Sequence, residues 1–178
     1  EVKLGGRTIR FEREEVKRQI DQLRKQKYLD GRTVFRGRLH DLALQAHQSS
    51  GRTAVFEQRA EIDLSAVDNL VDRIWPQLTP PQYLRELLNS RDRLLDAAGS
   101  EFSAHDVRLL HRSRSERVAD EIWSDSDIAL LDYVEHRLRG HQQYVHLVVD
   151  EAQDLSPMQL LMLANRSRRG SATVLGDI

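Results

Sequence analysis

Two adjacent carboxylates, Asp150 and Glu151, directly follow a run of apolar, mostly β-branched residues at 144–149. Such a run is typical of a buried parallel strand, and α/β proteins bind nucleotides at the carboxyl edge of a parallel sheet. An Asp at that edge can hold Mg²⁺, directly or through water, and a neighbouring Glu can orient or deprotonate the water that attacks a γ-phosphate. The pair therefore predicts half of a site that uses a nucleoside triphosphate.

The residues after the pair predict a strand–helix–strand unit that positions it. The strand at 144–149 ends at the two acids, and Ser156-Pro157 supplies an N-cap and a first-turn proline for a helix that ends before residue 170. A second strand at 172–175 ends in Gly176-Asp177. In a βαβ unit both strand ends lie at one edge of the sheet, so carboxylates are expected to gather there.

The chain before this unit is expected to be mostly helical. Apolar residues at helical spacing predict helices at about 12–28 and, less regularly, 33–48, and further helices after 65. The starts of the later helices carry capping signals, namely Ser65 with Asp68, Thr79 with Gln82, Ser103 with Asp106, and a serine at 126. We expect Trp75, Tyr83 and Trp123 to be core side chains rather than a platform on which bases stack. The arginine-rich stretch at 112–117 is expected to be an exposed linker, with phosphate contact as the alternative.

The first eleven residues predict a β-hairpin. Gly5-Gly6 supplies the positive φ of a two-residue turn, which sets Val2 opposite Ile9 and Leu4 opposite Arg7. Phe11 then lies on the same side as Val2, Leu4 and Ile9. The fold class is therefore mixed α/β and mainly helical.

Composition excludes several classes of protein. The chain has no cysteine, so disulfides and thiolate metal sites are ruled out, and no apolar run approaches membrane-spanning length. With no signal-peptide pattern, we expect a cytoplasmic protein that does not engage membranes. Residues 1–60 carry 14 Lys and Arg against 8 Asp and Glu, whereas residues 61–178 carry 13 against 20. The chain begins without Met and ends directly after a strand, so we expect it to be part of a longer protein.

The stretch Val148–Gln159 resembles motif II of the UvrD/Rep-like branch of superfamily 1 helicases, and Thr173–Asp177 resembles the start of their motif III. The resemblance implies a partial RecA-like motor domain with Mg²⁺ and ATP as cofactors. It implies that Asp150 binds the Mg²⁺ of Mg–ATP and that Glu151 positions the attacking water. It also implies four coupling residues: Gln153 and Asp154 of motif II, and Gly176 and Asp177 of motif III.

The phosphate-binding half of such a site is not in this sequence. No G-x-x-x-x-G-K-[ST] motif and no arginine-finger motif occur, and the Gln that follows Gly-Asp in motif III would lie beyond Ile178. We therefore expect the full-length protein to hydrolyse ATP, whereas residues 1–178 alone neither hydrolyse ATP nor bind it tightly.

The segments Trp75–Pro80 and Trp123–Asp132, together with the continuation Leu155–Leu160, narrow the resemblance to the HelD-like ATPases of actinobacteria. That family binds RNA polymerase and promotes its release from nucleic acid and its recycling. The resemblance implies that residues 1–140 are a family-specific insert, with a hairpin at 2–11 and helices over 12–140, and that residues 141–178 return to the motor core.

Two other functions remain open from the sequence. One is a DNA-unwinding repair helicase of the UvrD/Rep type, whose insert touches nucleic acid; the other is a purely structural helical module. A domain that tracks along DNA should show a basic stripe with stacking aromatics. Residues 61–140 are acidic on balance, which favours a protein partner such as RNA polymerase over nucleic acid.

Overall fold

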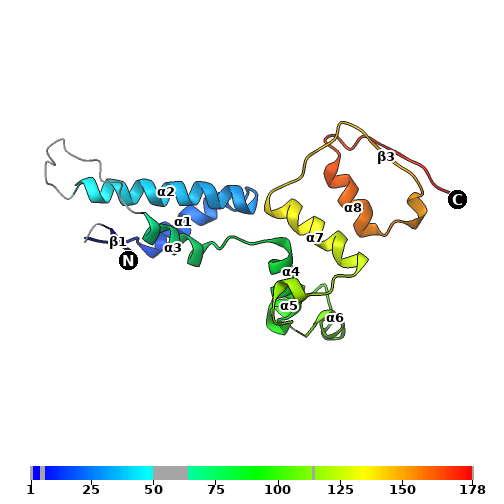
Figure 1. The fold of residues 1–178 in the computed structure, drawn as a ribbon, viewed down its shortest axis with the longest axis horizontal. Coiled ribbons are helices and arrows are strands. Elements are labelled where there is room, and N and C mark those ends of the chain that lie inside the picture. The colour runs from blue at the N-terminus through cyan, green and yellow to red at the C-terminus, as the bar shows by residue number, and fades with distance from the viewer. Residues whose placement is uncertain (1, 5–6, 50–63, 114, 178) are drawn as a thin grey trace. The chain divides into compact units, whose positions relative to one another are not determined.

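The computed structural model describes residues 2–4, 7–49, 64–113 and 115–177. The chain packs as two compact units, Glu1–Gln77 and Leu78–Ile178. As predicted, the architecture is mixed α/β and mainly helical, with an antiparallel hairpin in the first unit and a small parallel sheet in the second (Figure 1). Among the described helices, none is long and apolar enough to cross a membrane.

The first unit begins with the predicted hairpin. Strands β1 (Val2–Leu4) and β2 (Arg7–Ile9) are antiparallel, with Val2 opposite Ile9 and Leu4 opposite Arg7. The Gly5-Gly6 turn lies outside the described residues. Val2 and Ile9 are buried and Phe11 packs against the same cluster, so the predicted apolar side of the hairpin is confirmed for these three residues.

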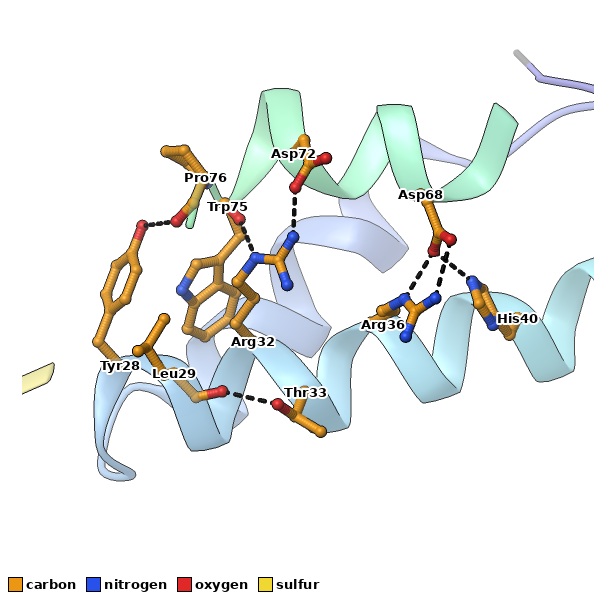
Figure 2. Close-up of polar contacts among 10 residues, drawn as sticks. All are labelled: Tyr28, Leu29, Arg32, Thr33, Arg36, His40, Asp68, Asp72, Trp75 and Pro76. Atoms are coloured by element: carbon orange, nitrogen blue, oxygen red, sulfur yellow. Dashed lines mark hydrogen bonds and ion pairs between the residues drawn. The ribbon is translucent and has the colours of Figure 1, made fainter. Parts of the chain in front are cut away.

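Three helices complete the first unit: α1 (Arg13–Leu23), α2 (Tyr28–Ser49) and α3 (Ser65–Ile74). The predicted end of the first helix at 28 and start of the second at 33 are both wrong. Residues 24–27 are all polar and form a turn after the buried Leu23, whereas Tyr28 starts α2 early because its ring packs on Trp75 and its hydroxyl donates to the Pro76 carbonyl at 3.0 Å (Figure 2). The buried core of the unit consists of Val2, Ile9, Leu23, Phe35, Leu39, Ala43, Val67, Val71 and Trp75.

Ion pairs fasten α3 to α2 and correct one predicted cap. Ser65 is the first helical residue, not an N-cap, and no side chain caps α3. Asp68 turns to α2 instead, where Arg36 donates to its two oxygens at 2.6 and 2.8 Å and His40 Nε2 lies 2.7 Å from Oδ1 (Figure 2). Asp68 gains more from these two side-chain partners than it would from capping one backbone N–H. The hydrogen bond from Arg36 lowers the pKa of Asp68 to about 2.

Two glycines of α2 should respond oppositely to alanine. A Cβ at Gly31 would lie 3.0 Å from Cη2 and 3.1 Å from Cζ2 of Trp75, whereas a Cβ at Gly37 would meet no described atom within 4 Å apart from its chain neighbours and the backbone of its own helix. We expect Gly31→Ala to lower the free energy of unfolding by about 1–3 kcal/mol, because the buried indole must shift. Gly37→Ala should raise it by about 0.5–1 kcal/mol, the ordinary helix-propensity gain. Urea unfolding of the chain measures both, and a stabilising Gly31→Ala would contradict the packing.

The second unit opens with α4 (Pro80–Leu88), α5 (Arg91–Ala98), α6 (Ala104–Leu110) and α7 (Asp125–Leu138). The predicted capping boxes of α4 and α6 are confirmed, but the one that starts α7 is formed by Ser124 and Asp127, not by Ser126. The core holds Leu84, Leu88, Leu94, Ala98 and Val107. Trp123 packs against it as predicted, whereas the prediction of a core Tyr83 is wrong, since that side chain is exposed.

The arginine-rich segment after α6 is exposed at Arg112, Ser113, Glu116 and Arg117, as predicted for a linker, but contacts with neighbouring helices hold it in place. Arg112 donates to both oxygens of the buried Asp127 at 2.9 and 2.7 Å. Arg85, itself buried, donates to the carbonyls of Ser115 and Glu116. These charged contacts hold the segment against α4 and α7.

The unit ends in the predicted strand–helix–strand. Strands β3 (Leu147–Val149) and β4 (Ala172–Val174) are parallel, and α8 (Pro157–Arg166) connects them with its predicted Ser156 cap. The predicted burial of the first strand is wrong, because 70% of Val148 is exposed. The connecting helix α8 packs on α7, and Val148 stays exposed. The packing divides the chain between residues 77 and 78. The predicted boundary between the insert and the motor core, between residues 140 and 141, stays a prediction.

Candidate functional site

The carboxyl ends of β3 and β4 carry the predicted site residues. The two segments that follow β3 and β4 stay hydrogen-bonded to each other. Leu175 N donates to the Val149 carbonyl at 2.8 Å, and Ala152 N donates to the Leu175 carbonyl at 2.9 Å. The loop after β3 is thereby held beside the end of β4. We call residues 150–154 the acid loop; its last three residues form the 3₁₀ turn η2 (Ala152–Asp154).

Glu151 has a left-handed backbone, with φ 52° and ψ 40°. It is the one non-glycine residue with a positive φ in the described part of the chain. For an L-residue this conformation costs about 1–2 kcal/mol. A hydrogen bond from Glu151 N to Asp150 Oδ1 at 2.9 Å offsets part of that cost. Backbone strain of this kind concentrates at functional sites, so the acid loop is the strongest such candidate in the chain.

Gln153 connects the acid loop to the end of β4. Its Nε2 donates to Glu151 Oε2 at 2.6 Å, and its Oε1 accepts from Asp177 N at 3.1 Å. A carboxamide can do both at once, since it offers a donor to the carboxylate and an acceptor to the N–H. The structure thus brings Glu151, Gln153 and Asp177 into one network.

Gly176 leaves the space that this network occupies. A Cβ at this position would collide with Gln153 Oε1 and would lie 3.3 Å from the backbone nitrogens of Ala152 and Gln153. Glycine therefore lets the end of β4 approach the acid loop closely enough for Gln153 to bridge them.

We expect Gly176→Ala and Gln153→Ala to impair the same contact. In the ATP hydrolysis that the sequence predicts for the full-length protein, each should lower kcat by about 10–100-fold, because a displaced Glu151 no longer presents its carboxylate correctly. Since both changes break one bridge, the double variant should be no slower than the slower single variant. Steady-state rates measure this, and multiplicative losses in the double variant would show that Gly176 acts independently of Gln153.

The remaining predicted residues differ in their placement. Asp154 donates its N–H to the Glu151 carbonyl at 3.1 Å. Its exposed side chain makes no hydrogen bond or ion pair with the described residues, so the structure does not bring that side chain into the network. Asp150 is exposed at the strand end. Its Oδ2 meets no hydrogen-bond partner among the described residues, which leaves an oxygen ligand of the kind that Mg²⁺ takes together with phosphate and water. No group of three His, Cys, Asp or Glu side chains placed to hold a metal occurs within the described ranges.

Sequence reasoning missed one polar contact beside this sheet. His146 lies with Nδ1 2.7 Å from Ser171 Oγ and Nε2 3.0 Å from Thr173 Oγ1, so it bridges two hydroxyls of the neighbouring chain segment. No local signal could have found it, because the partners follow from the register of the parallel pair.

No family model matches the chain, and no curated protein matches it.

Proposed function

We propose that this chain is part of an ATP-dependent, helicase-like motor of the UvrD/Rep-like branch of superfamily 1. The observation that carries the proposal is the Glu151 carboxylate, presented by a left-handed backbone at a parallel strand end and held by Gln153, which also binds the end of the next strand. A nucleotide site at the carboxyl edge of such a sheet needs an acid fixed in this way.

The proposed roles follow from this arrangement. Asp150 holds the Mg²⁺ of Mg–ATP through its available carboxylate oxygen, and Glu151 orients the attacking water. Gln153 fixes Glu151 and connects it to Gly176-Asp177, which respond to the γ-phosphate. Mg²⁺ neutralises phosphate charge when bound. The proposal includes a cytoplasmic location, since ATP is used there.

We further propose that the motor belongs to the HelD-like type and that its helical insert contacts RNA polymerase. Charge distribution supports a protein partner over DNA. Many arginines of the second unit are neutralised by carboxylates, in the pairs Arg85–Glu121, Arg93–Glu86, Arg112–Asp127, Arg117–Asp120, Arg139–Glu135 and Arg166–Asp132. Arginines that are paired with carboxylates bind a phosphate backbone poorly, because binding nucleic acid requires positive charge that is not already neutralised.

Binding of the purified 178-residue chain to core RNA polymerase and, separately, to single-stranded DNA at moderate salt tests the partner. The proposal predicts binding to the polymerase and weak, strongly salt-dependent binding to DNA. Tight DNA binding without polymerase binding would instead support the repair-helicase alternative. Binding to neither would favour a structural module for the insert.

A further inference from the structure

A cluster of charged side chains joins α7 to the far end of α8. Arg166, the last residue of α8, donates to Oδ1 of Asp132 in the middle of α7. His141 Nε2 lies 3.0 Å from both the carbonyl oxygen and Oδ2 of Asp132. Side-chain exposure is 15% for Asp132, 6% for His141 and 31% for Arg166, so the cluster is largely shielded from water.

Backbone hydrogen bonds fix the same end of α8. Tyr144 N donates to the Arg166 carbonyl at 2.7 Å, and Arg168 N donates back to the Tyr144 carbonyl at 2.9 Å. Tyr144 and Ser167 also form an isolated parallel bridge. The C-terminal end of α8 is therefore fastened both to α7 and to the segment that leads into β3.

The other end of α8 adjoins the acid loop. Ser156, two residues after η2, caps the helix by accepting from Gln159 N, while Gln159 Oε1 accepts from Ser156 N. Ten helical residues span about 15 Å and do not compress. A displacement of the acid loop that is carried into α8 therefore moves the helix as a body and reaches whatever holds its far end.

We propose that Arg166 and Asp132 are positioning residues that transmit movement of the acid loop to α7. The inference rests on the proposed nucleotide site. A shielded ion pair suits the task because breaking it would leave a partly buried charge without its partner, so α7 follows α8 rather than sliding along it. Since α7 packs on α4, the displacement spreads from α7 into the helical part of the unit.

The test is amide hydrogen exchange of the full-length protein with and without Mg²⁺ and a non-hydrolysable ATP analogue. In the wild-type protein the nucleotide should change amide exchange rates in both the acid loop and α7. The change in α7 should be about fivefold or more, the size expected for coupled sites. Arg166→Gln should retain the response of the acid loop and reduce that of α7 to less than about twofold. Arg166→Lys, which keeps a charge opposite Asp132, should preserve most of the α7 response.

Glu135→Gln is the matched control. It removes the Arg139–Glu135 pair, which lies on α7 close to Asp132 but connects the helix only to itself, so the α7 response should stay at the wild-type level. An α7 response that survives Arg166→Gln would overturn the inference and leave the proposed nucleotide site untouched. The same holds if, in the wild-type protein, the acid loop responds and α7 does not. An acid loop that does not respond in the wild-type protein would overturn the proposed nucleotide site, and the inference with it. If Arg166→Gln unfolds, Asp132→Asn at the other end of the pair takes its place. An α7 response reduced to less than about twofold beside an intact acid-loop response supports the inference, and an α7 response at the wild-type level overturns it.

Discussion

Glu151→Gln in the full-length protein is expected to abolish ATP hydrolysis while ATP binding stays unchanged. Glutamine has nearly the shape of glutamate but cannot accept a proton, so the water would be neither deprotonated nor strongly oriented. A loss of about 10²–10⁴-fold in kcat is expected for a missing general base. Turnover and equilibrium binding of ATP, measured on the same preparation, separate the two effects.

The geometry makes this substitution mild for the fold. Glu151 is exposed, and its side chain accepts one hydrogen bond, from Gln153 Nε2, which an amide oxygen can also accept. Glu101→Gln, an exposed acid in the turn after α5, serves as the control and should hydrolyse ATP at the wild-type rate. Unchanged turnover in Glu151→Gln would remove Glu151 from the proposed role.

The second large effect is expected at Asp127, and it concerns stability. Asp127→Ala should lower the free energy of unfolding of the second unit by about 2–4 kcal/mol. The carboxylate is 2% exposed, accepts both hydrogen bonds of Arg112 and accepts the backbone N–H of Ser124. Its loss leaves the Arg112 guanidinium without its partner and removes the half of the α7 capping box in which Asp127 accepts from Ser124 N. Urea unfolding measures it, with Glu135→Gln as an α7 variant that should change stability by less than about 1 kcal/mol. A loss below 1 kcal/mol for Asp127→Ala would contradict this account.

The same carboxylate should make the unit sensitive to acid. The hydrogen bond from Arg112 holds the pKa of Asp127 at about 2, below its ordinary value of 3.8. Because the folded pKa is the lower one, the stabilisation is complete above pH 4 to 5 and is lost as the pH falls toward 2. Stability measured between pH 5 and 2 should therefore fall about 2 kcal/mol less in Asp127→Asn than in the wild-type chain. Parallel pH curves would show that Asp127 is not held in this way.

Elements governed by neighbouring residues could be predicted from the sequence. The caps at Thr79, Ser103 and Ser156 are confirmed, because a hydroxyl and a side chain three residues later need no distant partner. The hairpin register is confirmed for a similar reason, since a two-residue turn determines which residues face each other.

Predictions failed where a distant partner decides the outcome. The sequence makes Asp68 a capping residue, but Arg36 and His40 lie more than twenty-five residues away and draw its carboxylate to α2. Tyr28 starts a helix early because Trp75 and Pro76 offer a contact that periodicity cannot register. An apolar run likewise predicts a strand but does not determine which other elements cover it. The exposure of Val148 therefore could not be predicted from the sequence.

The candidate site shows the same division. A strand that ends in Asp150 and Glu151 could be read directly from residue types, as could the second strand end at Gly176-Asp177. The bridge through Gln153 could not, because it depends on a left-handed residue at 151 and on hydrogen bonds between the strand ends. The Arg166–Asp132 pair spans thirty-four positions and carries no local signal.

ATP hydrolysis by the full-length protein, as wild type and as Asp150→Asn, tests the central claim most directly. We expect Mg²⁺-dependent turnover of about one per second or more from the wild-type protein. In Asp150→Asn that turnover should be lost, together with the Mg²⁺-dependent part of ATP binding, since the ion loses its carboxylate ligand. A wild-type protein that does not hydrolyse ATP, or an Asp150→Asn variant with full Mg²⁺-dependent activity, would contradict the assignment of the acid loop to a motor's nucleotide site.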